Sequence, residues 1–400
     1  MRLLSRRHLR RLVGGLASVT LAMSLGASTF GAASALPPRL ALSKGKQFFV
    51  DPQKGEDSGP GSFRRPWKTI ARAWQTVPQG SVIFVRAGTI ATQTILSGRM
   101  SGARNPITLR AYPREVVVLT DTTQTGSAVL VRGTSGVRIR GFRITNPAGD
   151  GIKVSGSSDV EIIANTIYGC ARQGILVGGS GTSGQTYSRN VQIWSNRITS
   201  NGSHARYDHG IYYGNVDVDD SSRQRGAIDG VIANNLFYNG RTGYHLQIGP
   251  QANGLIVTNN TFTGATSSDP YSGSAIVIWG SGHQYSTKNV LVVNNALAYN
   301  TNKGVQASGN ATDNTVRNNL AYANPGGDFA PTYDGNTLFT LTSNTTGTDP
   351  RFSDRTTNNY TPQDNSPLIN HADPAYAPPT DINGRPRQGP PDIGAYEHIR

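Results

Sequence analysis

Short apolar and polar alternations run through the middle of the chain, and each group of them ends near an asparagine. Six asparagines share this setting: Asn165, Asn196, Asn235, Asn260, Asn295 and Asn319. The segments around them read VEIIANTI, VQIWSNRI, VIANNLF, LIVTNNTF, VLVVNNAL and TVRNNLA. A repeated strand, asparagine turn and strand predicts a solenoid of stacked coils. We expect these asparagines to form an internal ladder that satisfies neighbouring backbone groups.

A second repeat is a short strand that follows a small residue in each coil. Its copies begin at Gly151, Gly174, Gly210, Gly243, Ala275 and Gly304, 23 to 36 residues apart. If the shortest spacing is a bare coil, the extra residues of the longer coils form loops. Solenoids tend to place such loops on a binding face.

The two ends of the repeat array have different patterns. Trp67, Ile70, Trp74 and Val77 recur at helical spacing, with Pro66 in a position suited to a first turn. An amphipathic helix here would cover the open end of the array. The tail, 349–400, is rich in Pro, Asp and Asn, and we expect an irregular cap wrapped on the last coil. The predicted fold is therefore an all-β parallel β-helix with an N-terminal capping helix and an irregular C-terminal cap.

The first residues have the pattern of an export signal. Five arginines, from Arg2 to Arg11, precede an apolar stretch, and Ala33-Ser34-Ala35 fits a cleavage site. Ser5-Arg6-Arg7 also resembles a twin-arginine signal, so secretion by either route is expected. The predicted organisation is a signal peptide over 1–35, a linker over 36–46, a β-helix domain over 47–330 and a capping extension over 331–400.

Composition supports an all-β repeat protein, since 36% of the chain is hydrophobic and 47 residues are glycine. The net charge is +14, and the chain stays basic without the signal arginines. A basic exported protein fits an acidic polysaccharide, and no nucleic-acid-binding module is recognisable. Cys170 is the single cysteine, so no intramolecular disulfide forms, and we expect it to be structural.

Both ends of the predicted β-helix resemble known secreted proteins. The N-terminal part contains Val50-Asp51-Pro52, Pro66-Trp67-Lys68-Thr69-Ile70 and Arg86-Ala87-Gly88-Thr89, and the tail contains Asp349-Pro350-Arg351-Phe352, Ser366-Pro367-Leu368-Ile369-Asn370 and Pro391-Asp392-Ile393-Gly394-Ala395-Tyr396-Glu397. These motifs resemble right-handed parallel β-helix proteins of the pectate lyase-like superfamily, including relatives of family 9 polysaccharide lyases. The resemblance implies a right-handed β-helix, and the fold itself hosts lyases, epimerases, hydrolases and adhesins.

Strand alternation predicts which side chains point outward on the second repeat. Aligned on the glycines, the first outward row is Lys153, Leu176, Tyr212, His245, Val277 and Gln306, and the next contains Gln247 and Trp279. Tyr213 is predicted to face the core. Polar and aromatic residues gather in three adjacent coils, which also carry long loops, as a sugar-binding groove requires. The predicted catalytic residues are His209, Tyr212, His245 and Arg241, and the predicted substrate-binding residues are Lys153, Tyr207, Asp208, Gln247, Trp279 and Tyr285.

The leading hypothesis is β-elimination on a uronate-containing polysaccharide. A base removes the proton beside the carboxyl group, and a cation or hydrogen-bond donor stabilises that carboxylate. Tyr212, His209 or His245 would act as base or acid, with Arg241, Gln247 or Lys153 holding the carboxylate. C5-epimerisation of a uronan starts with the same proton removal, and the sequence does not separate the two reactions.

Two other functions stay open. Hydrolysis needs paired carboxylates, for which Asp208, Asp217, Asp219 and Asp220 are candidates, although the strand rows hold almost no Asp or Glu. A non-catalytic carbohydrate-binding β-helix is the other alternative. Family 9 lyases bind Ca²⁺ through an aspartate cluster around an Asp-Asp-Gly run. Asp219-Asp220 is followed by Ser221, so we expect a metal-free site and keep Ca²⁺ as an alternative. We further expect a monomer without a membrane anchor.

Overall fold

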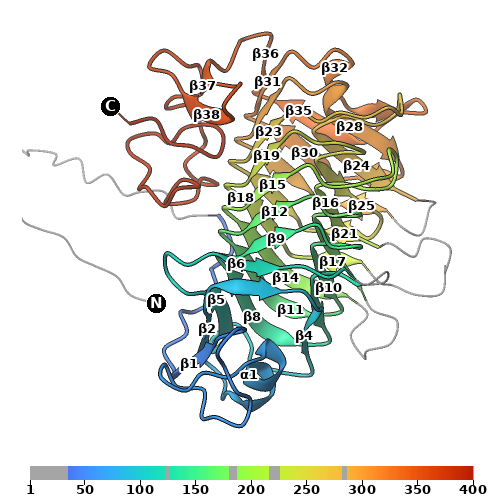
Figure 1. The fold of residues 1–400 in the computed structure, drawn as a ribbon. Coiled ribbons are helices and arrows are strands. Elements are labelled where there is room, and N and C mark those ends of the chain that lie inside the picture. Colours follow the sequence, from blue (N-terminus) through green and yellow to red (C-terminus); the bar gives the residue numbers. More distant parts are fainter. Residues whose placement is uncertain (1–34, 123–125, 180–186, 216–225, 282–285, 400) are drawn as a thin grey trace, which may run out of the picture. The chain divides into compact units, whose positions relative to one another are not determined.

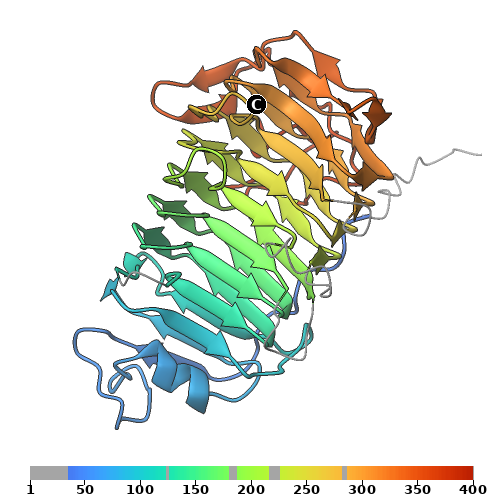
Figure 2. The same cartoon turned by 90° about the vertical axis from the view of Figure 1, so that its right-hand side faces the viewer.

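The computed structural model describes residues 35–122, 126–179, 187–215, 226–281 and 286–399. Within the unit from Ser34 to Arg400, most strands form three long parallel sheets, and the chain passes from one sheet to the next in every coil. Figures 1 and 2 show the coils stacked from the N-terminal end, in blue, to the last coils, in orange. The predicted parallel β-helix is confirmed. None of the described helices is long and apolar enough to cross a membrane.

Sheet 1 begins at the N-terminal strand and ends in the last coil. Its main path is β1 (Gln47–Val50), β2 (Val82–Val85), β5 (Ile107–Ala111), β8 (Ser135–Arg140), β11 (Ser158–Ile163), β14 (Ser188–Trp194), β18 (Val231–Ala233), β22 (Ile256–Thr258), β26 (Leu291–Val293), β30 (Asn314–Arg317) and β35 (Phe339–Thr342). A side path contains β17 (Ala227–Ile228), β21 (Ala252–Asn253), β25 (Thr287–Lys288) and β29 (Ala311–Thr312).

Sheet 2 contains the strands of the second sequence repeat. Its order is β4 (Thr94–Ser97), β7 (Val129–Arg132), β10 (Ile152–Ser155), β13 (Ile175–Gly178), β16 (Ile211–Tyr213), β20 (Leu246–Ile248), β24 (Ile276–Gly280), β28 (Lys303–Gly309) and β32 (Gly327–Ala330). Aliphatic side chains stack through its inner face, and those of Ile152, Ile175, Ile211, Leu246 and Ile276 are fully buried. Each such side chain stabilises the fold by about 1.5–3 kcal/mol relative to exposure.

Sheet 3 completes the coils. Its order is β3 (Gly88–Ile90), β6 (Val117–Leu119), β9 (Arg143–Thr145), β12 (Thr166–Tyr168), β15 (Arg197–Thr199), β19 (Leu236–Tyr238), β23 (Thr261–Thr263), β27 (Ala296–Ala298), β31 (Leu320–Tyr322) and β36 (Thr345–Thr346). Since β35 and β36 pair with the preceding coil, the stack continues past the predicted domain boundary at residue 330. Two antiparallel hairpins lie outside the three sheets: β33 (Thr332–Tyr333) with β34 (Asn336–Thr337), between β32 and β35, and β37 (Phe352–Asp354) with β38 (Asn359–Pro362), after the stack.

The N-terminal helix is present but begins later than the sequence pattern predicts. Helix α1 (Ile70–Thr76) starts after Thr69, whose hydroxyl group accepts a hydrogen bond from the backbone N–H of Arg72. Thr69 is thus an ordinary N-cap, and Pro66 lies before the helix. Trp67 lies before the helix, forms an isolated parallel β-bridge with Val50 and is almost fully buried.

The asparagine ladder is confirmed as an internal feature of the turns. From Asn196 onward, each carboxamide oxygen accepts the backbone N–H of the asparagine one coil earlier, as Asn260 does from Asn235 at 2.8 Å. The first rung, Asn165, accepts that of Phe142. The ladder runs from Asn165 to Asn319 and continues to Asn344, which sequence reasoning missed. Because every rung bonds to its neighbours, the buried amides are satisfied.

We expect Asn260→Ala to destabilise the fold strongly. The change leaves the backbone N–H of Asn235 and the carbonyl of Ile232 without their buried partner. Buried unpaired groups cost about 1–3 kcal/mol each, so a loss of about 2–4 kcal/mol is expected in urea unfolding. Asn336→Ala, at an exposed hairpin position, is the control and is expected to change stability by less than about 0.5 kcal/mol. Equal effects of the two substitutions would contradict the role of the ladder.

The tail lies along the flank of the coils, which corrects the expected cap on the last coil. Its apolar residues pack on the outer side of sheet 3, forming one buried cluster that includes Leu236, Leu320, Phe352 and Ile393. Figure 1 shows β37 and β38 beside the stack. The physical reason is that β19, β27 and β31 present apolar side chains outward, and the tail covers them.

The residue before each later rung of the ladder holds this tail. Asn259, Asn294 and Asn318 have positive φ angles of 50°, 59° and 51°. Their amide groups point away from the core and donate to backbone carbonyls of Asp392, Asp373 and His371, respectively. Asparagine tolerates this left-handed conformation better than most residues. Each Asn-Asn pair therefore places one amide in the ladder and one on the tail.

The segment 36–46, predicted as a linker, packs against sheet 1. The side chain of Gln192 donates to the Pro38 carbonyl at 2.9 Å, and Arg138 donates to the Leu40 carbonyl at 2.8 Å. Glu161 is fully buried between Arg39 and Arg138 and pairs with both. The segment is thus part of the folded unit. The predicted export signal over 1–35 lies almost wholly outside the described residues.

Candidate functional site

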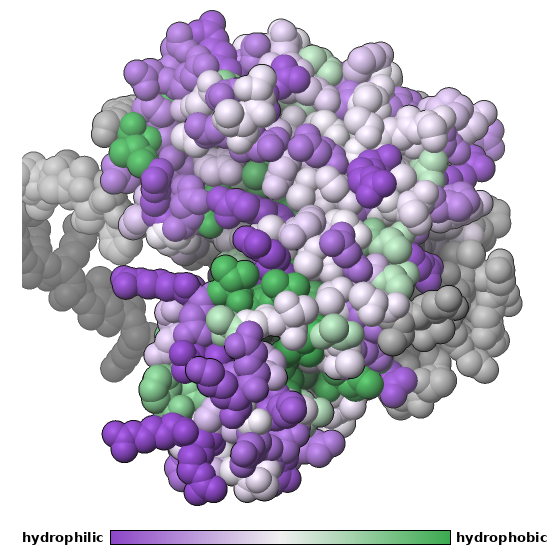
Figure 3. Space-filling view, in the orientation of Figure 1, coloured by the Kyte–Doolittle hydropathy of each residue, from purple (hydrophilic) through white to green (hydrophobic). Residues whose placement is uncertain are grey.

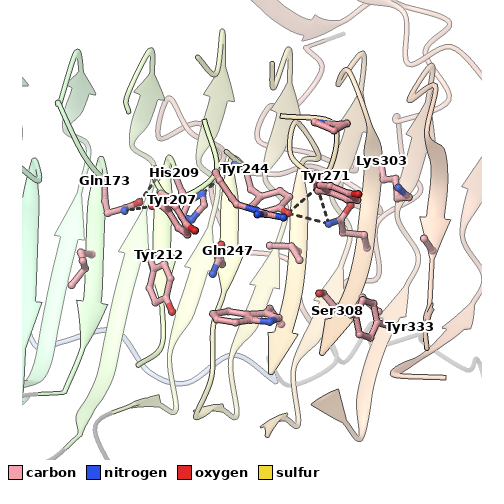
Figure 4. A pocket seen from close by; sticks show the side chains of 18 of the residues that line it. Gln173, Tyr207, His209, Tyr212, Tyr244, Gln247, Tyr271, Lys303, Ser308 and Tyr333 are labelled. Carbon is pink, nitrogen blue, oxygen red and sulfur yellow. Dashed lines mark hydrogen bonds between the residues drawn. The ribbon is translucent and has the colours of Figure 1, made fainter. Parts of the chain in front are cut away.

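A groove lies over the outer face of sheet 2, in the middle and C-terminal coils. Its cavity volume is about 890 Å³. The floor comes from β13, β16, β20, β24, β28 and β32, and the walls come from the turns at 206–207 and 270–271 and from the hairpin at 332–333. Figure 4 shows the lining side chains on successive strands, with Gln173 and Tyr212 at one end and Ser308 and Tyr333 at the other. The sheet fixes the floor residues at regular intervals of about 4.8 Å.

The observed register of sheet 2 corrects one coil of the predicted rows. Tyr212 is paired with Gln247, and Gln247 with Val277, so the row reads Lys153, Leu176, Tyr212, Gln247, Val277 and Gln306. Aligning Gly243 with Gly210 would pair Tyr244 with Ile211. In the structure Leu246 pairs with Ile211, so the strand begins two residues later than the alignment predicts. Gln247 is therefore a neighbour of Tyr212 rather than a member of the next row.

His245 is a core residue, and its placement in the groove was wrong. It occupies the register position that is Gly210 in the preceding coil, is 2% exposed, and its ring lies 5.8 Å from that of Phe237. Its Nε2 atom is 2.9 Å from the Thr263 carbonyl oxygen. Gly210 has no side chain at this register position. Aligning the coils on their glycines therefore did not show that His245 occupies the same position one coil later.

His209 is the histidine that lines the groove. Its ring stacks between Tyr212, at 6.0 Å between centroids, and Tyr244, at 5.4 Å. The backbone N–H of Tyr244 donates to Nδ1 at 3.2 Å, so the proton of the neutral ring is on Nε2. Burial lowers the pKa of His209 to about 3, and the ring is neutral at physiological pH. His209 is only 1% exposed, so its Nε2–H group can donate only to a ligand atom that comes into contact with this ring from the groove.

Tyr212 lies next to His209 on the floor. Its hydroxyl group donates to the Asn215 carbonyl at 2.7 Å, and the side chain is 7% exposed. Burial raises the pKa of Tyr212, while a hydrogen bond from Gln247 acts in the opposite direction. A Cβ atom at Gly249 would lie 2.5 Å from the Tyr212 hydroxyl oxygen, so the glycine leaves room for this ring. Tyr213 points into the core, as predicted.

A hydrogen-bond network holds the wall of the groove on its floor. The Tyr244 hydroxyl donates to the Tyr271 carbonyl at 2.9 Å, and Gln306 donates to the same hydroxyl at 3.2 Å. Arg206 lies 5.4 Å from the Tyr271 ring and pairs with Asp269 at 3.7 Å. The two wall turns are therefore joined to each other and to β28. Sequence reasoning missed Tyr244, Tyr271 and Arg206, and the correct register of Leu246 would have identified Tyr244.

Electrostatically, the groove is cationic. Arg172, Arg206 and Lys303 line it, and among its described lining residues there is no Asp or Glu. Six aromatic side chains complete the lining: Tyr207, Tyr212, Tyr244, Tyr271, Trp279 and Tyr333. Tyr207, Tyr271 and Tyr333 are 64%, 67% and 49% exposed, so their rings are accessible to a ligand. Guanidinium groups can bind carboxylates in a bidentate manner, and exposed aromatic rings offer flat apolar faces to a ligand.

Four other predicted site residues lie outside this lining or cannot be placed. Arg241 is exposed in a turn, and Lys153 lies on β10, towards the N-terminal end of sheet 2. Asp208 is buried, and its carboxylate accepts the backbone N–H groups of Ser203 and His204, which is a structural role. Tyr285 lies outside the described residues, as do Asp217, Asp219 and Asp220.

Calcium, kept as an alternative by the sequence, would find no carboxylate ligand in the described lining of the groove. No three His, Cys, Asp or Glu side chains come together among the described residues as metal ligands. Calcium binds six to eight oxygen ligands, and the described lining supplies cations where carboxylates would be needed. Cys170 is buried, as expected, and burial raises the pKa of its thiol.

The buried histidines make stability depend on pH. Burial lowers the pKa of His245 to about 4, whereas a histidine in an unfolded chain titrates near about 6.5. The unfolded state therefore takes up protons that the folded state resists. We expect the free energy of unfolding to fall as pH drops from about 6.5 to about 4, by up to about 1.4 kcal/mol per pH unit for each buried histidine.

Urea unfolding across this pH range measures the effect. His245→Leu is expected to give a shallower dependence, and His371→Gln, at an exposed position, is expected to leave the slope unchanged. A slope that is the same in all three proteins would contradict the burial of His245.

Comparisons with known proteins agree with the observed fold. A family model described as "Pel9A-like, right handed beta helix region" matches residues 48–337. The crystal structure of pectate lyase Pel9A is similar over 89% of this chain and 97% of its own, with a TM-score of 0.55 and 16% identity. An alginate lyase from Paenibacillus sp. str. FPU-7 is similar over 75% of this chain and 99% of its own, with a TM-score of 0.49 and 18% identity. No curated protein sequence matches. The chain belongs to the Pel9A-like family of right-handed parallel β-helix proteins.

Proposed function

We propose that this chain is a polysaccharide lyase that cleaves a uronate-containing polysaccharide by β-elimination in the groove over sheet 2. The observation that carries the proposal is the lining: three cationic side chains, six aromatic rings and no carboxylate among the described residues. A groove of this charge attracts a polyanion and neutralises the carboxylate next to the reacting carbon. Hydrolysis is disfavoured because it needs paired carboxylates, which the described lining lacks.

In the proposed reaction Tyr212 exchanges the proton. Its phenolate takes the proton from the carbon beside the carboxylate, a double bond forms to the next carbon, and the bond from that carbon to the glycosidic oxygen breaks. The same hydroxyl group then gives the proton to the leaving oxygen, which restores the phenolate. One residue can serve both steps because it lies on one face of the bound sugar.

His209 stabilises the charge that develops in this reaction. Removing the proton shifts negative charge onto the carboxylate, and the Nε2–H group of a neutral His209 can donate to it. The stacked rings of Tyr212 and Tyr244 hold the imidazole in place. Arg172 and Arg206, which also line the groove, attract the polymer. Tyr207, exposed in the wall, and Trp279, on the floor, would stack on sugar rings.

Product analysis after incubation with acidic polysaccharides tests the proposal. Polygalacturonate, alginate, glucuronan and glycosaminoglycans are each incubated with the protein, and ultraviolet absorbance detects a new unsaturated uronate. Absorbance that rises with one of these polymers is the expected result. Altered sugar composition at unchanged chain length would indicate an epimerase, and binding without a product would indicate a carbohydrate-binding protein; either would overturn the proposal. Export forms part of it, because such polymers lie outside the cell.

A further inference from the structure

A second surface combines arginine with aromatic rings, at the N-terminal end of sheet 1. Phe49, Phe84, Arg110 and Arg140 form one outward row on β1, β2, β5 and β8. The ring of Tyr112 lies 5.6 Å from that of Phe84, and the ring of Phe63 lies 5.3 Å from that of Phe49. We call these six residues the arginine–aromatic platform. It lies on a different sheet from the groove, over the blue strands of Figure 1.

Among the described residues, the two arginines of the platform have no carboxylate partner. Arg110 and Arg140 are directly opposite each other on adjacent strands, where like charges destabilise a sheet. Arg110 Nε is buried without a hydrogen-bond partner. Neither guanidinium takes part in an ion pair of the described residues. Burial and the charge of Arg140 both lower the pKa of Arg110. By contrast, the nearby Arg86 is paired with Glu115. An anion bound between Arg110 and Arg140 would remove the repulsion.

The aromatic part of the platform indicates what else the ligand must offer. Phe63 is 53% exposed, and the guanidinium of Arg110 lies 5.3 Å from the ring of Phe84. Of the six platform residues, Phe63 is the one that counts among the exposed large hydrophobic side chains of the described residues. Figure 3 shows a separate group of hydrophobic residues in the lower half of the molecule, around β4 and β6, which belong to sheets 2 and 3 and not to the platform. A ligand with both an apolar face and a carboxylate fits this combination better than a bare anion does.

We propose that the arginine–aromatic platform is a second, non-catalytic binding site for an acidic polysaccharide, with a carboxylate between Arg110 and Arg140 and a sugar ring on the exposed aromatic face. The site would hold the polymer on the protein while the groove acts on another part of it. The inference shares its ligand class with the proposed function but does not depend on elimination. Holding one chain at two sites raises the effective concentration at the groove.

Affinity electrophoresis through gels that contain polygalacturonate or alginate tests this site. We expect the Arg110→Gln/Arg140→Gln double variant to be retarded less than wild type, with the apparent Kd raised about tenfold or more, since both charge-assisted hydrogen bonds to the carboxylate are lost. The matched control is Arg104→Gln/Arg143→Gln, which removes the same charge at exposed positions outside the platform and is expected to keep wild-type retardation. Gels with neutral dextran correct for altered mobility.

Three results would overturn the inference. The first is that the platform variant is retarded as much as wild type. The second is that the charge-matched control loses as much retardation as the platform variant. The third is that the platform binds duplex DNA but neither polygalacturonate nor alginate. Phe63→Ala, at an exposed ring, tests the aromatic part without removing charge, and its retardation should also fall. Because binding is measured without product formation, a failure of the platform and a failure of the proposed lyase activity give different results.

Discussion

Replacing Tyr212 with phenylalanine is expected to lower the turnover of the uronan by about 10²–10⁴-fold, the usual contribution of a positioned acid or base. The substitution removes the one hydroxyl group that the proposed reaction uses and leaves the ring in its place between His209 and Gly249. KM is expected to change little, because the stacking surface remains. Initial rates from ultraviolet absorbance, with urea unfolding as a check on folding, measure the effect.

The pH dependence of the wild-type rate gives a second readout of the same residue. Burial raises the pKa of Tyr212, so its phenolate is scarce at neutral pH and increases as pH rises. We expect kcat/KM to increase up to about tenfold per pH unit above neutrality, until another group titrates or the fold fails. Tyr212→Phe should lose this dependence. A rate in the phenylalanine variant close to that of wild type, or a wild-type rate that falls above neutral pH, would contradict the role of Tyr212.

The second large effect is expected at His209. His209→Ala removes the Nε2–H donor and should lower kcat by about 10²–10³-fold, as the loss of a donor to a developing anion does. His209→Asn keeps a side-chain N–H group of shorter reach, so part of the activity should return. A general base would behave differently, because an amide cannot accept a proton, and asparagine would then be as inactive as alanine.

The pH profile separates these roles further. Burial lowers the pKa of His209 to about 3, so the ring stays neutral from about pH 5 upward. No decrease of the rate near pH 6.5 should therefore arise from this residue. A histidine-dependent decrease there, absent from His209→Asn, would show that His209 titrates in the working range. His371→Gln is the control, since that histidine is exposed and lies in the tail.

The fold was predictable because its signals are local and repeated. Alternating apolar residues predict the strands, and the asparagine before each turn is needed in every coil, so six copies support one another. The tail was misplaced because its docking depends on the outward faces of β19, β27 and β31, which a search for inward residues ignores. The Asn-Asn pairs carried that information, since one ladder needs only one asparagine per coil.

The site was only partly predictable, for a geometric reason. His209, Tyr212, Tyr207, Gln247 and Trp279 all line the groove, as expected. His245 does not, because an offset of two residues in one coil moves a side chain to another row without disturbing the apolar alternation. Tyr271 and Arg206 belong to wall turns that have no repeat, so no register could place them.

The mass of the products released from a uronan tests the central claim most directly. β-Elimination breaks the chain without adding water, so each new non-reducing end should be an unsaturated uronate, one water lighter than the saturated oligosaccharide of equal length. We predict this lighter series with wild-type protein and its near absence with Tyr212→Phe. Saturated fragments of full mass would show hydrolysis, and products that persist at wild-type yield in Tyr212→Phe would show that the chemistry does not depend on the groove described above.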